Sequence, residues 1–225
     1  MNRKTLIDQY VELKIAGRTE PAYGKIIDSG QDIVVLFNGI QYLFIPLQHI
    51  LQIRIVTSDT DIGEFLTATD IPLEFERSNE AISYRKVLMN AKGMFSELYV
   101  TGNHTIHGYI TSVMNDFFVF YSPVYHTVII SIYHLKYLIP YSPNMTPYTL
   151  TQEKFPLKPS PVKLSRTFDQ QLLKMVGEFA VFDLGESPNK VGVLKKVEQN
   201  MAELTNADGS PVLLSLNHIK TVHLP

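Results

Sequence analysis

The chain has 225 residues, of which 45% are hydrophobic and 19% are charged, a balance typical of a folded soluble protein and not of a disordered one. Its formal net charge of −2 provides no electrostatic attraction to nucleic acid or to an anionic membrane, and a chain without cysteine has no disulfides, thiol catalysis or cysteine metal sites. No apolar run approaches the roughly 18 residues of a membrane span, and no apolar segment follows Met1-Asn2-Arg3, so synthesis in the cytoplasm without a signal peptide is expected.

The N-terminal part of the chain predicts a short helix followed by five strands. Residues 3–9 have a weak helical pattern, and residues 11–15 predict the first strand. Gly24 begins the next strand, and Gln31-Asp32 predicts the turn after it. Asn38-Gly39 then predicts a type I′ hairpin, which requires positive φ. His49 precedes a last short strand.

The same pattern occurs three times at regular spacing. A glycine recurs every 84 residues, at Gly24, Gly108 and Gly192. A histidine follows each glycine by 25 or 26 residues, at His49, His134 and His218. This self-similarity indicates three copies of one small unit. We interpret the glycine as the start of a bent strand and the histidine as a turn residue whose ring nitrogen bonds a backbone carbonyl. Ligand contact is the alternative, and a metal role is disfavoured because each copy has one such histidine and no cysteine.

The middle copy is rich in aromatic side chains and poor in charge. Residues 79–92 predict its helix and residues 98–101 its first strand, while the loop at 122–126 predicts a longer or differently built hairpin. Between residues 95 and 141 lie 11 of the chain's 24 aromatic residues and only three charges. These rings are expected to pack between the copies of this chain or against a partner. The candidate interaction surface comprises Tyr109, Phe118, Phe120, Tyr121, Tyr125, Tyr133 and Tyr137.

The third copy begins with a clear helix signal. Thr167 and Gln170 form a capping-box pattern, an apolar stripe follows, and Gly177 is expected to end the helix. Residues 179–182 predict the first strand, and Asp208-Gly209 predicts a hairpin at the place that Asn38-Gly39 holds in the first copy.

Five segments result from this organisation. They are the first repeat (1–57), an acidic linker (58–78), a helix with the second repeat (79–141), a Pro-rich linker (142–164) and a helix with the third repeat (165–225). The acidic linker is interpreted as a solvated connector, with a docking segment for a basic partner as the alternative. Proline fixes φ and removes a hydrogen-bond donor, so the second linker is expected to be an extended spacer.

The arrangement of each copy resembles the Sm-type small barrel. A helix precedes five short strands, and the copies close with an apolar-x-His segment, at 47–50 and 133–136, similar to the last motif of bacterial Hfq. The resemblance implies a mainly β fold of three tandem Sm-like (SH3-type) five-stranded barrels, each preceded by a short α-helix. An RNA-binding or regulatory module of the Sm/Hfq type is therefore the alternative function, although fused, diverged and nearly neutral units depart from the basic ring of identical Hfq subunits.

A closer resemblance covers nearly the whole chain. Three copies ending in apolar-x-His-apolar, with matching stretches at 17–25, 184–192 and 216–222, resemble the N-terminal triple-repeat region of the Bacillus spore coat protein B-like family. This resemblance implies a non-enzymatic structural or assembly role in the spore coat, on its mother-cell side. Its partners would be other coat proteins or further copies of the chain. The long Ser/Lys-rich tail of that family has no counterpart here, so no function of the tail carries over.

Searches for chemistry along the sequence yield no catalytic residues, no cofactor-binding residues and no metal site. Four histidines lie near the middle copy, at His104, His107, His126 and His134, and we interpret their grouping as incidental because Asp116 is the only nearby carboxylate. Nucleic acid, membrane and small-molecule substrates are not expected partners. Exposed barrel edges and the aromatic middle copy are the expected contact surfaces.

Overall fold

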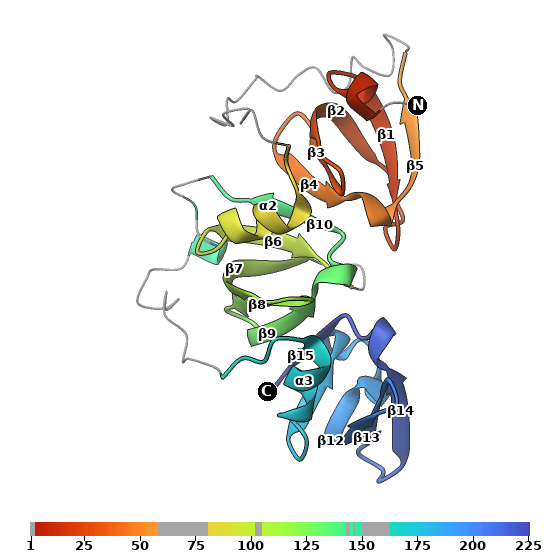
Figure 1. Cartoon of the computed structure of the whole chain (residues 1–225), viewed down its shortest axis with the longest axis vertical. Helices are drawn as coiled ribbons and strands as arrows, with labels where there is room; N and C mark the ends of the chain where they lie inside the picture. Colours follow the sequence, from red (N-terminus) through yellow and green to blue (C-terminus); the bar gives the residue numbers. More distant parts are fainter. Residues whose placement is uncertain (1–2, 58–80, 102–104, 143–144, 146, 150–162) are drawn as a thin grey trace. The chain divides into compact units, whose positions relative to one another are not determined.

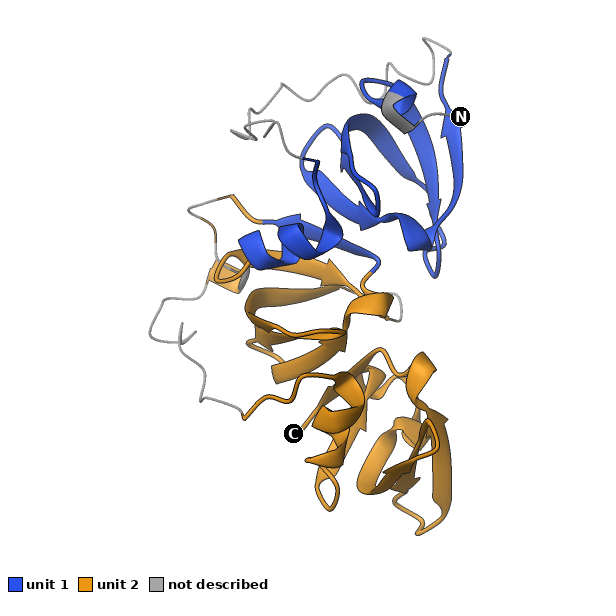
Figure 2. Ribbon diagram, in the orientation of Figure 1, with its two compact units in different colours: residues 1–90, 136–140 blue, residues 91–135, 141–225 orange. Residues whose placement is uncertain are grey.

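The computed structural model describes residues 3–57, 81–101, 105–142, 145, 147–149 and 163–225, which are mainly β structure with short helices, as the sequence predicts (Figure 1). The chain divides into two compact units, one of residues 1–90 with 136–140 and the other of residues 91–135 with 141–225 (Figure 2). The acidic linker and most of the Pro-rich linker lie outside the described residues. None of the described helices is long and apolar enough to cross a membrane.

The first unit holds one antiparallel sheet in the strand order β10-β4-β3-β2-β1-β5. Its strands are β1 (Tyr10–Ile15), β2 (Ala22–Ser29), β3 (Ile33–Phe37), β4 (Tyr42–Pro46), β5 (Ile50–Ile55) and β10 (Tyr137–Pro140). The segment predicted as the leading helix forms the 3-10 helix η1 (Arg3–Leu6). Helix α2 (Tyr84–Asn90) is shorter than the predicted 79–92, of which residues 79 and 80 lie outside the described residues. A 3-10 turn, η2 (Leu47–His49), joins β4 to β5.

The second unit holds an antiparallel sheet in the order β14-β13-β12-β11-β15-β9-β8-β7-β6. From the second repeat come β6 (Phe95–Tyr99), β7 (Thr105–Val113), β8 (Phe117–Ser122), β9 (His126–Ser131) and turn η3 (Ile132–His134). From the third come α3 (Phe168–Leu173), β11 (Phe179–Phe182), β12 (Val191–Glu198), β13 (Met201–Thr205), β14 (Pro211–Ser215), η7 (Leu216–His218) and β15 (Thr221–His223).

A core shared by the second and third repeats explains part of the aromatic enrichment. Phe117 and Val119 of β8 are buried in one cluster with Phe168 and Leu172 of α3. The neighbouring residues Phe118 and Phe120, which point to the opposite face of β8, are also fully buried. A strand buried on both faces favours a continuous apolar run, which is what residues 117–120 provide.

The three repeat glycines are required by a close approach of two strands. A Cβ built on Gly24 would lie 2.1 Å from the carbonyl oxygen of Phe37, and the corresponding distances at Gly108 and Gly192 are 1.9 Å and 2.3 Å, to backbone oxygens of Tyr121 and Thr205. Each glycine lies inside β2, β7 or β12 and not at its first residue. The recurring glycine therefore has a structural role, as predicted. Its cause is the backbone carbonyl of the neighbouring strand, which leaves no room for a Cβ atom.

The predicted hairpins form, although their turn chemistry differs from the prediction. Only the second residue of each predicted pair has positive φ, +92° at Gly39 and +84° at Gly209, so neither pair is a type I′ turn. The Asn38 carboxamide instead accepts the N–H groups of Ile40 and Gln41. In the middle repeat three residues separate β8 from β9, so that loop is differently built but shorter than the four-residue loop between β3 and β4.

Candidate functional site

Adjacent repeats are joined by strand addition, in which a strand of one repeat pairs with the sheet edge of another. We call these places the junctions. Within the second unit β15, the last strand of the third repeat, pairs with β9 of the second repeat as well as with β11. Within the first unit β10, which closes the second repeat in sequence, pairs with β4 of the first. Among the described ladders no fourth strand pairs with the fifth strand of its own repeat, so the repeats are not closed barrels.

Each junction also includes a helix whose N-terminus is capped by the preceding repeat. Asp116 Oδ1 accepts a 2.8 Å hydrogen bond from the Phe168 N–H at the start of α3, and Asp32 Oδ1 accepts one of the same length from the Tyr84 N–H at the start of α2. The capping box predicted at Thr167 is wrong, because its hydroxyl caps no backbone N–H and donates to the Asp169 carboxylate instead. Sequence-local reasoning missed a capping carboxylate that lies 52 residues away.

The repeat histidines end the 3-10 turns before the last strands, where the sequence places them. His134 Nε2 lies 2.9 Å from the carbonyl oxygen of Asn217, which belongs to the next repeat's turn. His49 Nδ1 lies 3.1 Å from Lys136 Nζ, again supplied by the sequence of the next repeat. His218 is exposed, and its ring makes no hydrogen bond to the described part of the chain. His49 and His134 therefore contact the following repeat and do not simply set their own corner.

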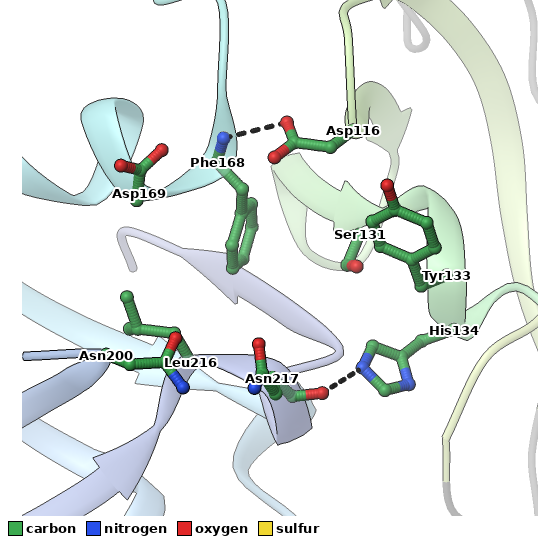
Figure 3. A pocket seen from close by; sticks show the side chains of 9 residues that line it. All are labelled: Asp116, Ser131, Tyr133, His134, Phe168, Asp169, Asn200, Leu216 and Asn217. Atoms are coloured by element: carbon green, nitrogen blue, oxygen red, sulfur yellow. Dashed lines mark hydrogen bonds between the residues drawn. The ribbon is translucent and has the colours of Figure 1, made fainter.

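An open pocket of about 580 Å³ lies where the second and third repeats meet (Figure 3). It is lined by Asp116, Ser131, Tyr133, His134, Phe168, Asp169, Asn200, Leu216 and Asn217. Burial raises the pKa of the Asp116 carboxyl above its ordinary value, against the lowering effect of the hydrogen bond from Phe168. In Figure 3 the dashed lines show that Asp116 and His134 are already engaged by the neighbouring repeat.

The chemistry available in this pocket is limited. Two carboxylates, Asp116 and Asp169, oppose a single titratable base, His134, so the lining does not favour a phosphate or another anion. Asp116 and His134 in this lining join the second repeat to the third.

A network of charged side chains also links the second and third repeats. Glu186 accepts hydrogen bonds from Lys190 and from the hydroxyl of Thr101, a residue of the second repeat, and Lys220 Nζ lies 3.3 Å from its Oε1. Although burial acts in the opposite direction, these hydrogen bonds and the Lys220 charge lower the pKa of Glu186 to about 2. Asp183 Oδ1 accepts the backbone N–H groups of Lys220 and Thr221, which fixes the start of β15.

The structure corrects most of the predicted aromatic surface. Phe118 and Phe120 are fully buried and Tyr109 and Tyr137 are nearly so, because they lie within strands that are covered on both faces. Tyr133 is 60% exposed and lines the pocket, and Tyr121 and Tyr125 are half-buried. Most of these rings therefore pack within the chain, which is one of the two roles that the sequence left open for them.

The histidines of the middle repeat do not form a metal site among the described residues. His107 lies 2.8 Å from the Tyr141 hydroxyl through Nδ1 and 3.3 Å from the Thr105 hydroxyl through Nε2. His126 lies at the start of β9, beside the ring of Tyr121. His104 lies outside the described residues.

Two sheet edges, which sequence reasoning left unspecified, expose apolar side chains. On β5, Leu51 is 71% and Ile53 is 36% exposed, and on β14, Leu213 is 61% exposed. These strands are the last strand of the first repeat and the fourth strand of the third repeat, and they end the sheets of their units. Superposing the three repeats in sequence would have found them, because among the described residues their counterparts in the other repeats pair with a neighbouring repeat.

Comparison with known proteins gives two matches. Residues 167–222 match a family model described as the YwrJ third domain, a segment that runs from Thr167 before α3 to the middle of β15. Over 218 residues the chain is 50% identical to "Uncharacterized protein YwrJ" of Bacillus subtilis (strain 168), with 96% of this chain and 95% of that protein covered. The similarity therefore extends over all three repeats.

Proposed function

We propose that this chain, which belongs to the YwrJ family, is a non-enzymatic structural or assembly component of the bacterial spore coat that acts through protein–protein contacts. The coat assignment follows from the resemblance of the triple repeat to the spore coat protein B-like family. The proposal that the chain acts through protein–protein contacts is based on the junctions between its repeats.

The observation that carries this proposal is the repeated use of strand addition. Val222 of β15 is opposite Ile129 of β9, and Leu138 of β10 is opposite Phe44 of β4. Adding a strand to a sheet edge is a general mode of protein–protein recognition, in which main-chain hydrogen bonds provide affinity and side-chain pairs provide specificity. A chain built in this way, with apolar edges left over on β5 and β14, is suited to assembly.

We further propose that each repeat is an open, Sm-like unit. The third repeat has the complete order β14-β13-β12-β11-β15 within one sheet, and the first has the same order, β4-β3-β2-β1-β5. A 3-10 turn ending in histidine precedes the last strand in every repeat. At each internal junction the fourth strand of one repeat pairs with the fifth strand of the next repeat instead of closing a barrel.

The RNA-binding or regulatory alternative gains no specific support. Its natural site would be the pocket formed by the polar turns, and Asp116 and Asp169 give that pocket the wrong charge for a phosphate backbone. RNA binding is therefore an outcome that the following test distinguishes.

The test is the location of a fluorescent fusion of the full chain in sporulating cells. A ring around the forespore on the mother-cell side is expected, whereas signal that stays diffuse throughout sporulation would contradict the coat role. The fluorescent protein alone is the control. Purified chain that carries material absorbing at 260 nm, or that shifts single-stranded RNA at physiological salt, would favour the alternative function.

A further inference from the structure

We propose that the chain associates head to tail with further copies of itself, strand β14 of one copy pairing antiparallel with strand β5 of the next. The inference deepens the proposed function, on which it rests for its biological role, by naming a second copy of the chain as a partner. Its physical basis is the junction that the chain makes twice internally.

The register of this junction is the same in both internal cases. Positions in each repeat can be counted from its repeat histidine. At both junctions the residue four positions after the histidine of the later repeat lies opposite the residue five positions before the histidine of the earlier repeat. These pairs are Leu138 with Phe44 and Val222 with Ile129. At the two unpaired edges the same positions hold Ile53, four residues after His49, and Leu213, five residues before His218. The pair expected between copies is therefore Ile53 with Leu213.

Burial distinguishes the occupied positions from the unoccupied ones. At the internal junctions the paired side chains are 0–8% exposed: Leu138 1%, Phe44 8%, Val222 0% and Ile129 5%. At the free edges Ile53 is 36% and Leu213 is 61% exposed. Pairing the two edges would remove this apolar surface from water, which is the main favourable term in association.

The backbone and turn contacts of the junction between the second and third repeats also have counterparts at the free edges. The Ser131 N–H donates to the carbonyl oxygen of Lys220, and the equivalent groups are the Ser215 N–H and the Leu51 carbonyl. His134 lies against the carbonyl of Asn217, and the equivalent pair is His218 with Gln48. Strand β14 carries no charged side chain, and proline protects its edge only at the first residue, Pro211.

The residues on the strand next to the junction predict how strong the contact between two copies is. Phe117 and Val119 on β8 are buried beneath the third repeat, and the equivalent residues of β13, Met201 and Glu203, are half-buried. A junction between two copies would therefore bury the carboxylate of Glu203, whereas the junction between the second and third repeats buries Val119 at the equivalent position. We expect the contact to be reversible and weaker than the internal junctions.

The experiment is sedimentation velocity combined with light scattering of the purified full chain over a wide concentration range. The mean mass of the wild type is expected to rise above the 25.6 kDa of one chain as concentration increases. Leu213→Lys and Ile53→Glu are each expected to weaken association by roughly tenfold or more. The double variant is expected to recover much of the loss, because opposite charges directly across an antiparallel pair attract.

Ile40→Lys is the matched control, since Ile40 is 73% exposed in the loop between β3 and β4 and belongs to neither edge. A wild type that stays at the mass of one chain at every concentration would overturn the inference. So would a double variant no better than the single variants, or an equal effect of Ile40→Lys. A monomeric chain that still rings the forespore would overturn this inference alone, while a self-associating chain that stays diffuse would overturn the coat role alone.

Discussion

Asp116 accepts the backbone N–H of Phe168 at 2.8 Å, so a carboxylate in one repeat caps the helix that leads into the next. Asp32 and Tyr84 repeat the relationship at the first junction, also 52 residues apart. Repeats in this chain are thus linked by helix capping as well as by strand pairing.

The first prediction concerns this cap. Asp116→Ala is expected to lower the free energy of unfolding by about 1 kcal/mol, because it leaves a helix N–H without its acceptor. Asp116→Asn keeps an acceptor and is expected to be at least as stable as the wild type at pH 7. The reason is that burial raises the pKa of Asp116, so the ionised form is disfavoured in the folded chain.

The sign of the pH dependence follows from the direction of this shift. A raised carboxyl pKa means that the folded state binds the proton of Asp116 more tightly than the unfolded state does. The contribution of this proton to the free energy of unfolding is therefore present below the ordinary pKa of 3.8 and falls as pH rises through the raised pKa. Urea denaturation of wild type and Asp116→Asn across this range checks the sign. A stability difference that changes in the opposite direction would contradict the assignment.

The second prediction concerns the repeat glycines. Gly108→Ala would place a Cβ 1.9 Å from the Tyr121 carbonyl oxygen, a clash that only movement of the backbone relieves, and we expect a loss of about 3 kcal/mol or more. Gly209→Ala is the matched control, because no atom lies within 4 Å of its built Cβ and only the φ of +84° opposes the change. That control is expected to cost about 1–2 kcal/mol. Equal losses in thermal or urea unfolding would show that the carbonyl contact is unimportant.

The third prediction tests the corrected position of the aromatic residues. Phe120→Ala is expected to cost about 3–5 kcal/mol, because it leaves a cavity in a fully buried strand. Tyr133→Ala, on a side chain that is 60% exposed, is expected to change stability by no more than about 0.5 kcal/mol. Urea midpoints of the two variants give the comparison. A large loss at Tyr133 with little change at Phe120 would reverse the assignment of core and surface.

The fourth prediction concerns the charged network at the second junction. The pKa of Glu186 is lowered from 4.5 to about 2, so its stabilising contribution is present above 4.5 and is lost as pH falls toward 2. Glu186→Gln is expected to remove this acid dependence, with a loss at pH 7 on the order of 1 kcal/mol after solvent screening. Glu198→Gln is the control, because Glu198 pairs with Lys196 at the surface. Identical acid unfolding of wild type and Glu186→Gln would contradict the network's role.

Much of the local structure could be predicted from the sequence. The recurring spacing of Gly24, Gly108 and Gly192 identified the repeats, and the order of strands, hairpins and histidine turns within each repeat followed from apolar patterns and turn residues. These features depend on interactions between residues close in sequence, which a periodic pattern records directly.

The junctions could not be predicted, because their partners lie far apart in the chain. Nothing near Thr167 indicates that Asp116 would replace it as the cap of α3. Strand β15 has three residues, and its short apolar pattern does not specify that its second edge pairs with β9. Phe118 and Phe120 were assigned to a surface because burial on both faces of β8 requires knowledge of what covers each face.

Cysteine cross-linking between separate chains tests most directly whether the edges β5 and β14 are the two halves of one junction. The chain has no cysteine, so Ile53→Cys and Leu213→Cys introduce the only thiols, at positions whose Cα atoms would lie about 4.5–5.5 Å apart in an antiparallel pair. An equimolar mixture under mild oxidation is expected to give a disulfide-linked heterodimer in excess of either homodimer. A mixture of Ile40→Cys and Leu213→Cys chains is expected to give no such excess. Homodimers and heterodimers in random proportion, or no cross-link, would contradict the claim.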